Sequence, residues 1–164
     1  MLLNNANLDI YPRSMVSAHD LEYGLARTPA GHKLVILGST GNSYLNAFEG
    51  RQSEFKQHTL LIGPLNPQNA EALRLQIPWL QPVPLGLGTS AGMGDRLGIA
   101  TPGHVRALRE IRGRVAPIFA QQSIREMQRT GRSPQQVLDE ATWGVFEEGW
   151  QGGVGAERRC SMIV

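Results

Sequence analysis

The sequence has little of several features that would define a class of protein. Its single cysteine, Cys160, cannot form an internal disulfide, which favours a reducing compartment. No run approaches the ~18 apolar residues of a membrane-spanning helix. The first residues also lack the basic start and apolar run of a secretory signal. We therefore expect a cytoplasmic protein with no membrane partner.

An excess of charge of one sign is also lacking. The 16 basic residues are balanced by 14 acidic ones, so the formal net charge is only +2 at pH 7. Domains that bind nucleic acid gather their basic residues on one face, whereas here acidic residues lie among them. We expect a mildly basic, solvated surface and no nucleic-acid partner.

Sequence motifs for metal and nucleotide binding are missing as well. No HxxxH, HxH or CxxC spacing occurs, so the sequence indicates no metal site of its own. The loop at residues 38–43 lacks the Gly-Lys-Ser/Thr ending of a phosphate-binding P-loop, and we interpret it as a turn.

What the chain does contain is the pattern of an α/β protein. With 164 residues, of which 41% are hydrophobic, it can bury a core. Apolar runs at residues 21–27 and 32–37 flank a turn at 28–31, and this spacing predicts a β-hairpin. Residues 48–57 are polar and are typical of a loop or a weak helix.

From residue 59 on, expected strands alternate with expected helices. The strands are apolar runs at residues 59–62, 83–87 and 115–120. Three expected helices begin with a capping residue followed by proline, at Asn66-Pro67, Thr101-Pro102 and Ser133-Pro134. A short fourth helix is expected at 123–130. This order predicts parallel βαβ units. We divide the chain into a lead-in and β-hairpin region (1–58), βα units of a partial (β/α) barrel-like parallel sheet (59–156), and an aberrant tail (157–164).

Two polar segments follow expected strands and form the candidate site. A glycine-rich loop ends at Asp95 and Arg96, and the next strand leads into Gln121, Gln122 and Ser123. The carboxyl ends of parallel strands share one edge of a sheet, where ligands bind. Arg96 suits a two-pronged contact with a carboxylate, and the amides and hydroxyl suit sugar hydroxyls. Equally compatible is a structural interpretation in which Asp95 pairs with Arg96 or caps the following helix.

Three segments of the chain are similar to the tagaturonate epimerase family. They are YPRS (11–14), GDRLGIATPGH (94–104) and AQQSIREMQRTGRSPQQVLDEATWGVFEEGW (120–150). The resemblance implies a (β/α)-barrel-like, divalent-metal-dependent enzyme of bacterial hexuronate catabolism. Such an enzyme inverts carbon 4 of a keto-uronate and thereby interconverts tagaturonate and fructuronate.

The resemblance also implies roles for individual residues. Asp95 and Arg96 match the GDR segment of the family, and Gln122 and Ser123 match its QQS segment. We therefore expect Ser123 and Asp95 to be catalytic, and Arg96, Gln121, Gln122 and Ser123 to bind the keto-uronate or ketose substrate.

The end of the chain departs from the family pattern. The family continues into an Asp-Ala-Asp-His motif that supplies acid and metal-ligand chemistry, whereas here eight dissimilar residues follow Ala156. We therefore expect the amino-terminal part of such an enzyme, truncated or frameshifted after Ala156, with no metal bound to this chain. A partial barrel would also leave a sheet edge uncovered and favour self-association.

Two other functions stay open. One is a non-catalytic sugar-acid binding remnant that keeps the polar loops and lacks the metal site. The other is a phosphate or nucleotide binder that uses the glycine loop at residues 86–94, although its glycine spacing is irregular and it has no P-loop lysine.

Overall fold

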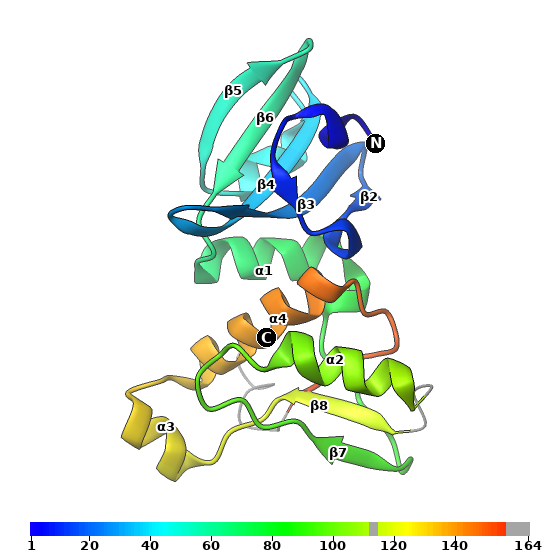
Figure 1. Ribbon diagram of the computed structural model, residues 1–164, viewed down its shortest axis with the longest axis vertical. Helices are drawn as coiled ribbons and strands as arrows, with labels where there is room; N and C mark the ends of the chain where they lie inside the picture. Colours follow the sequence, from blue (N-terminus) through cyan, green and yellow to red (C-terminus); the bar gives the residue numbers. More distant parts are fainter. Residues whose placement is uncertain (112–114, 157–164) are drawn as a thin grey trace. The chain divides into compact units, whose positions relative to one another are not determined.

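The computed structural model describes residues 1–111 and 115–156, and the chain divides into two compact units, Met1–Ile77 and Pro78–Val164 (Figure 1). Each unit is described by itself. The tail at 157–164, which the sequence marks as aberrant, and Cys160 within it, lie outside the described residues.

The first unit is built on an antiparallel sheet with the strand order β1-β3-β4-β6-β5, and β2 also pairs with β3. Its strands are β1 (Asp9–Ile10), β2 (Val16–Ala18), β3 (Leu21–Thr28), β4 (Gly31–Ser39), β5 (Arg51–Phe55) and β6 (His58–Gly63). Short 3-10 helices connect them: η1 (Leu2–Asn5), η2 (Pro12–Ser14) and η3 (Ser43–Ala47).

The predicted hairpin is confirmed as β3 and β4. Thr28 pairs with Gly31, and Gly31 takes a φ of 95°, a conformation that glycine adopts without strain. Away from the exposed turn, residues 23–26 of β3 and 34–38 of β4 are continuously buried. On one face, the hydrophobic core contains Leu3, Ala26, Val35, Leu37 and Leu60. The hairpin is therefore the centre of the first unit.

Two expectations for residues 48–63 are wrong. The segment expected to be a loop or weak helix contains strand β5, whose residues are mostly exposed and so carry no apolar pattern. The run at 59–62 does form a strand, β6, but this strand pairs antiparallel with β4 and β5 instead of opening a parallel sheet. Consequently the first unit extends to Ile77, beyond the boundary that we placed after residue 58.

Helix α1 (Pro67–Gln76) completes the first unit. As expected, Asn66 caps it, accepting the N–H of Asn69 at 2.9 Å. The fully buried Asn69 in turn donates to the Glu49 carbonyl at 2.9 Å. At the other end of the helix, the buried Tyr23 hydroxyl of β3 donates to the side-chain oxygen of Gln76. The Tyr23 contact attaches α1 to the antiparallel sheet, and the Asn69 contact attaches it to the segment before β5.

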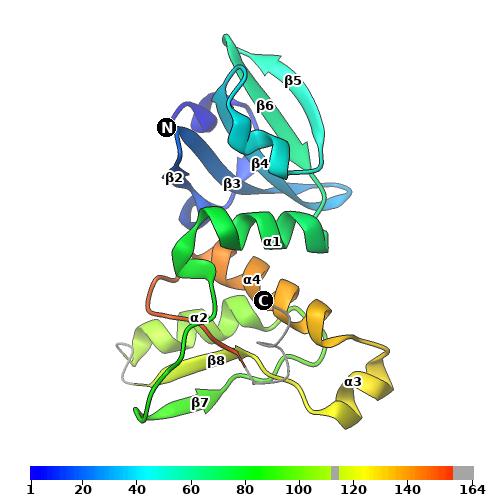
Figure 2. The ribbon, with the colours of Figure 1, turned by 180° about the vertical axis from the view of Figure 1, so that it is seen from behind.

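The second unit contains a three-stranded parallel sheet with the order β7-β8-β9. Helix α4 packs against both β8 and α2 (Figures 1 and 2). The elements are η4 (Pro78–Leu80), β7 (Ser90–Gly92), α2 (Thr101–Glu110), β8 (Ala116–Ala120), α3 (Ile124–Thr130), α4 (Pro134–Glu148) and β9 (Gly155–Ala156). The predicted strand at 115–120 and the three helices are confirmed, but the expected cap of α2 at Thr101 is wrong. Thr101 is the first residue of that helix and Ala100 is its N-cap.

The expected strand at residues 83–87 is absent from this sheet. Strand β7 forms later, and the preceding segment contributes only an isolated bridge between Pro82 and Val154. Val83 is 46% exposed and Leu87 is fully exposed, so this apolar run is not a buried strand. Part of the glycine loop therefore precedes the strand instead of following it. The described sheet is small and parallel, and its closure into a barrel remains a prediction.

Helix α4 begins with the predicted capping box. The Ser133 hydroxyl accepts the Gln136 N–H at 3.2 Å, and the Gln136 side chain accepts the Ser133 N–H at 2.8 Å. The helix ends at Gly149, which has a φ of 57°. It has 15 residues, and no helix in the described ranges is long and apolar enough to cross a bilayer.

Candidate functional site

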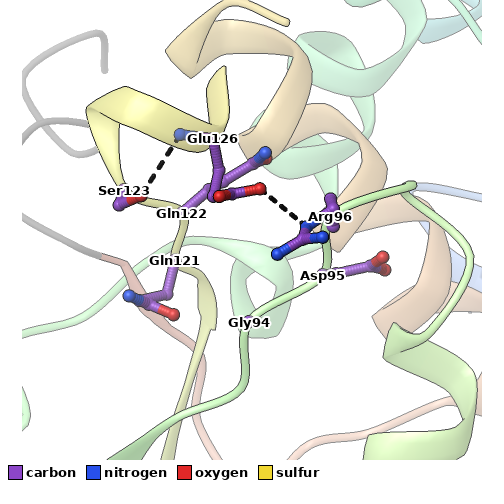
Figure 3. Close-up of a pocket in the computed structure, with 7 residues that line it drawn as sticks. All are labelled: Gly94, Asp95, Arg96, Gln121, Gln122, Ser123 and Glu126. Atoms are coloured by element: carbon purple, nitrogen blue, oxygen red, sulfur yellow. Dashed lines mark hydrogen bonds and ion pairs between the residues drawn. The ribbon is translucent and has the colours of Figure 1, made fainter. Parts of the chain in front are cut away.

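A shallow cavity of about 290 Å³ collects every residue that the sequence analysis assigned to the site (Figure 3). Its lining comprises Gly94, Asp95, Arg96, Gln121, Gln122, Ser123 and Glu126. Strands β7 and β8 run parallel, so the two polar segments that follow them reach the same edge of the sheet. Glu126 is the charged lining residue that the sequence analysis did not assign to the site.

The Asp95 carboxylate is occupied by the backbone of its own loop. One of its oxygens lies 2.8 Å from the Gly98 nitrogen and the other lies 2.7 Å from the Ala100 nitrogen. The full set of N–H donors comes from Leu97, Gly98, Ile99, Ala100 and Thr101. Asp95 thereby braces the β7–α2 loop and caps α2, whose N-cap residue, Ala100, offers no side-chain acceptor.

These contacts also set the protonation of Asp95. Burial acts to raise its pKa, but the hydrogen bonds from the backbone N–H groups of residues 98–101 outweigh burial and lower the pKa below its ordinary value. A general base works best when its pKa lies near the working pH. The helix-capping part of the structural interpretation is therefore confirmed, and a direct catalytic role for Asp95 stays a prediction.

Arg96 pairs with Glu126 rather than with Asp95. Its Nε lies 2.7 Å from one Glu126 oxygen, and the other oxygen lies 3.2 Å from Arg129. Figure 3 shows the Asp95 carboxylate directed away from this pair. The Arg96 side chain is 66% exposed, and the Nε contact uses only one of the five N–H groups of a guanidinium. Arg96 is thus an oriented, solvent-accessible cation at the cavity.

Ser123 and Gln121 lie on the opposite wall. Ser123 is exposed and caps α3, since its hydroxyl accepts the Glu126 N–H at 3.3 Å. Gln121 approaches the first loop closely, because a Cβ on Gly94 would lie 3.1 Å from the Gln121 side-chain oxygen. Glycine at position 94 therefore leaves room for this amide beside the cavity.

Gln122 is more deeply placed than its neighbours. It is 4% exposed, its oxygen accepts a hydrogen bond from Arg132 at 2.7 Å, and its nitrogen lies 3.4 Å from the Thr130 hydroxyl. Its amide is therefore held by internal partners. Arg132 lies outside the pattern of strands and loops that the sequence analysis used, and only its contacts in the folded chain associate it with the site.

The acidic residues at the cavity do not fit a metal ion. Within residues 1–111 and 115–156, no group of three or more His, Cys, Asp or Glu side chains is arranged to hold one. The carboxylate of Asp95 is saturated by backbone N–H groups, and that of Glu126 contacts two arginines. The divalent metal expected for the family therefore remains a prediction about the complete enzyme.

A further sequence pattern turns out to have no catalytic geometry. Residues 88–92 read Gly-Thr-Ser-Ala-Gly, which has the spacing of a hydrolase nucleophile elbow. In such an elbow the serine stands on a sharp turn from a strand into a helix. Ser90 instead opens strand β7 and pairs with Ala116 of β8, so the pattern is part of the sheet.

Comparison with known proteins agrees with the sequence resemblance. Residues 11–158 match the family model described as tagaturonate epimerase, and this span includes the whole cavity. Over 149 residues the chain is 43% identical to a tagaturonate/fructuronate epimerase of Thermotoga maritima. That alignment covers 91% of this chain and 30% of the relative.

Solved structures show the same relationship. Crystal structures of the fructuronate-tagaturonate epimerase of Cohnella laeviribosi match with TM-scores of 0.80 for a glycerol complex and 0.79 for the native form. Both are 35% identical to this chain, covering 94% of it and 30% of the epimerase. This chain thus spans about 30% of the length of the relatives that it matches.

Proposed function

This chain belongs to the tagaturonate epimerase family, and on that premise we propose that it forms part of a sugar-acid epimerase acting on tagaturonate and fructuronate. The observation that carries the proposal is the 43% identity to a curated tagaturonate/fructuronate epimerase. We further propose that the chain supplies one wall of the substrate site and acts in the cytoplasm.

In this proposal, Arg96 binds the substrate carboxylate. A uronate carries one carboxylate and several hydroxyl groups, and a guanidinium donates two parallel hydrogen bonds to a carboxylate. Arg96 is the exposed cation that lines the cavity, and Glu126 holds it through Nε. An ion pair at Nε orients the guanidinium without using its other N–H groups.

The opposite wall holds the substrate hydroxyls. The Ser123 hydroxyl and the Gln121 amide supply donors and acceptors suited to them, and we propose that Ser123 contacts the substrate directly. Asp95 acts through its loop, by keeping Arg96 in place. Inversion at one carbon requires that the carboxylate and the hydroxyls be held in a single orientation, and these residues provide that orientation.

Calorimetric titration with tagaturonate tests the proposed wall. We expect wild-type chain to bind it and Arg96→Ala to weaken binding by about tenfold or more, since a hydrogen-bonded charge contact is lost. Arg125→Ala is the matched control, because Arg125 is an exposed arginine of α3 that does not line the cavity. Equal binding by wild type and Arg96→Ala would contradict the role of Arg96.

The second candidate function is sugar-acid binding without catalysis. It is favoured by the cavity itself, whose polar residues suit a sugar acid while its two carboxylates are engaged by other groups. Epimerisation of tagaturonate, assayed with and without added divalent metal, separates the two functions. Binding with no fructuronate formed under either condition would identify a binding module, whereas turnover would support the epimerase.

A further inference from the structure

Arg132 connects the two walls of the cavity. It lies between α3 and α4, and its side chain is only 10% exposed. One terminal nitrogen donates to the Asp95 carbonyl at 2.6 Å and to the Gln122 side-chain oxygen at 2.7 Å. The other terminal nitrogen pairs with Glu140 of α4. One guanidinium thus contacts the β7–α2 loop, the β8–α3 loop and a helix.

The geometry of these contacts is specific to arginine. Removing a cation from water is costly, and burial accordingly lowers the pKa of Arg132. The cost is offset by the Glu140 carboxylate and two oxygen acceptors. A planar guanidinium reaches acceptors in several directions at once, whereas a lysine ammonium is a single point charge on a flexible stem.

The β7–α2 loop also rests on α4 at a second point. A Cβ built on Gly98 would overlap the carboxylate of Glu140, and Gly98 has a φ of 75°. The backbone conformation at Gly98 favours glycine, and the absence of a Cβ leaves room for the Glu140 carboxylate. Asp95 holds the amides of this loop from within, while Arg132 and Glu140 hold its backbone against the helix.

We propose that Arg132 is a positioning residue that sets the separation of the two cavity walls. Through the Asp95 carbonyl it places Arg96, and through the Gln122 amide it places Gln121 and Ser123. The identity of the ligand rests on the proposed function, but the coupling of the two loops does not. Replacing Arg132 should therefore loosen both loops and weaken the binding of a ligand that spans them.

Arg132→Lys is the decisive variant, because it keeps the positive charge and removes the planar guanidinium that reaches several acceptors at once. Hydrogen exchange of the backbone amides, thermal unfolding and calorimetric binding of tagaturonate are measured for wild type, Arg132→Lys and the matched control Arg125→Lys. We expect Arg132→Lys to speed exchange at residues 97–101 and to weaken tagaturonate binding, each by about tenfold. Amides in the middle of α4 should keep their wild-type rates, and Arg125→Lys should match wild type throughout.

Gly98→Ala provides a second route to the same test. It disturbs the contact between the loop and α4 without changing any charge, so it should weaken binding in the same direction even if Arg132→Lys folds poorly. Unchanged exchange at residues 97–101 in Arg132→Lys would overturn the proposal, with or without a ligand. Faster exchange with unchanged tagaturonate binding would also overturn it. If wild type binds no tagaturonate, the proposed function fails, while the exchange rates still decide the coupling of the loops.

Discussion

Asp95 and Arg96 are neighbours in the sequence with opposite environments. Asp95 is 7% exposed and bonds to the backbone of its own loop, whereas the Arg96 side chain is 66% exposed and faces the cavity. The aspartate therefore shapes the loop, while the arginine is the exposed cation that we propose binds the ligand. The hydrogen bonds from N–H groups replace those that the carboxylate would make with water, so its burial costs little free energy.

Asp95→Asn should lower the free energy of unfolding by about 1–3 kcal/mol near pH 7, because an amide cannot replace a carboxylate as the acceptor of five N–H groups. The pKa of Asp95 is lower in the folded chain than its ordinary value of 3.8. Its contribution is therefore complete above about pH 4 and is lost as the pH falls through the lowered pKa.

Urea unfolding at pH 7 and at pH 3 measures this difference. The exposed Asp9 serves as a control, and Asp9→Asn should change stability little at either pH. A loss of stability in Asp95→Asn that is the same at both pH values would contradict the assignment of the carboxylate as an ionised brace.

At the scale of elements, the crossing of α2 and α4 positions the cavity wall that the β7–α2 loop forms. Gly144 of α4 lies against the start of α2, where a Cβ would come within 2.6 Å of the Thr101 Cβ. Two arginines of α2, Arg106 and Arg109, each lie 2.7 Å from the buried carboxylate of Glu148 near the other end of α4. The β7–α2 loop is thus anchored to a helix that is itself held at both ends.

Two glycine-to-alanine substitutions should change the free energy of unfolding in opposite directions. Gly103→Ala, at a position of α2 where a Cβ meets nothing within 4 Å, should raise stability by about 0.5 kcal/mol through helix propensity. Gly144→Ala should lower it by about 1–3 kcal/mol, because the overlap with Thr101 exceeds that gain. Thermal unfolding of the two variants checks the signs, and stabilisation by both would show that the crossing is looser than described.

At the scale of the whole molecule, the second unit exposes apolar side chains. Leu87 is fully exposed, Leu97 is 68% exposed and Ile99 is 75% exposed. In the parallel sheet β7 and β9 are the outer strands, and parallel sheets are normally covered. We propose that this unit favours self-association.

Light scattering after size exclusion tests this proposal. We expect the mass of the wild-type chain to rise with concentration, and Leu97→Ser with Ile99→Ser to reduce that rise. The fold should survive, because the contacts of these residues with Asp95 use backbone N–H groups. Leu75→Ser, an equally exposed position in the first unit, is the control. A concentration-independent monomer, or an equal effect of the control, would contradict the proposal.

Features that depend on neighbouring residues could be predicted from the sequence. The cap at Asn66, the capping box at Ser133 and the hairpin turn before Gly31 each join groups a few residues apart, so the local pattern determines them. The meeting of Asp95 and Arg96 with residues 121–123 could also be predicted, because polar segments that follow parallel strands reach a common edge, whereas the place of Glu126 at the cavity could not.

Only the tertiary structure decided which distant groups meet. The apolar run at 59–62 indicates a strand but not its partner, so its pairing with β4 was not predictable. Arg132 contacts Asp95 across 37 positions, and no local pattern indicates such a contact. Short-range hydrogen bonds and periodicity select the elements, whereas strand pairing and the burial of charge depend on the packing of the whole unit.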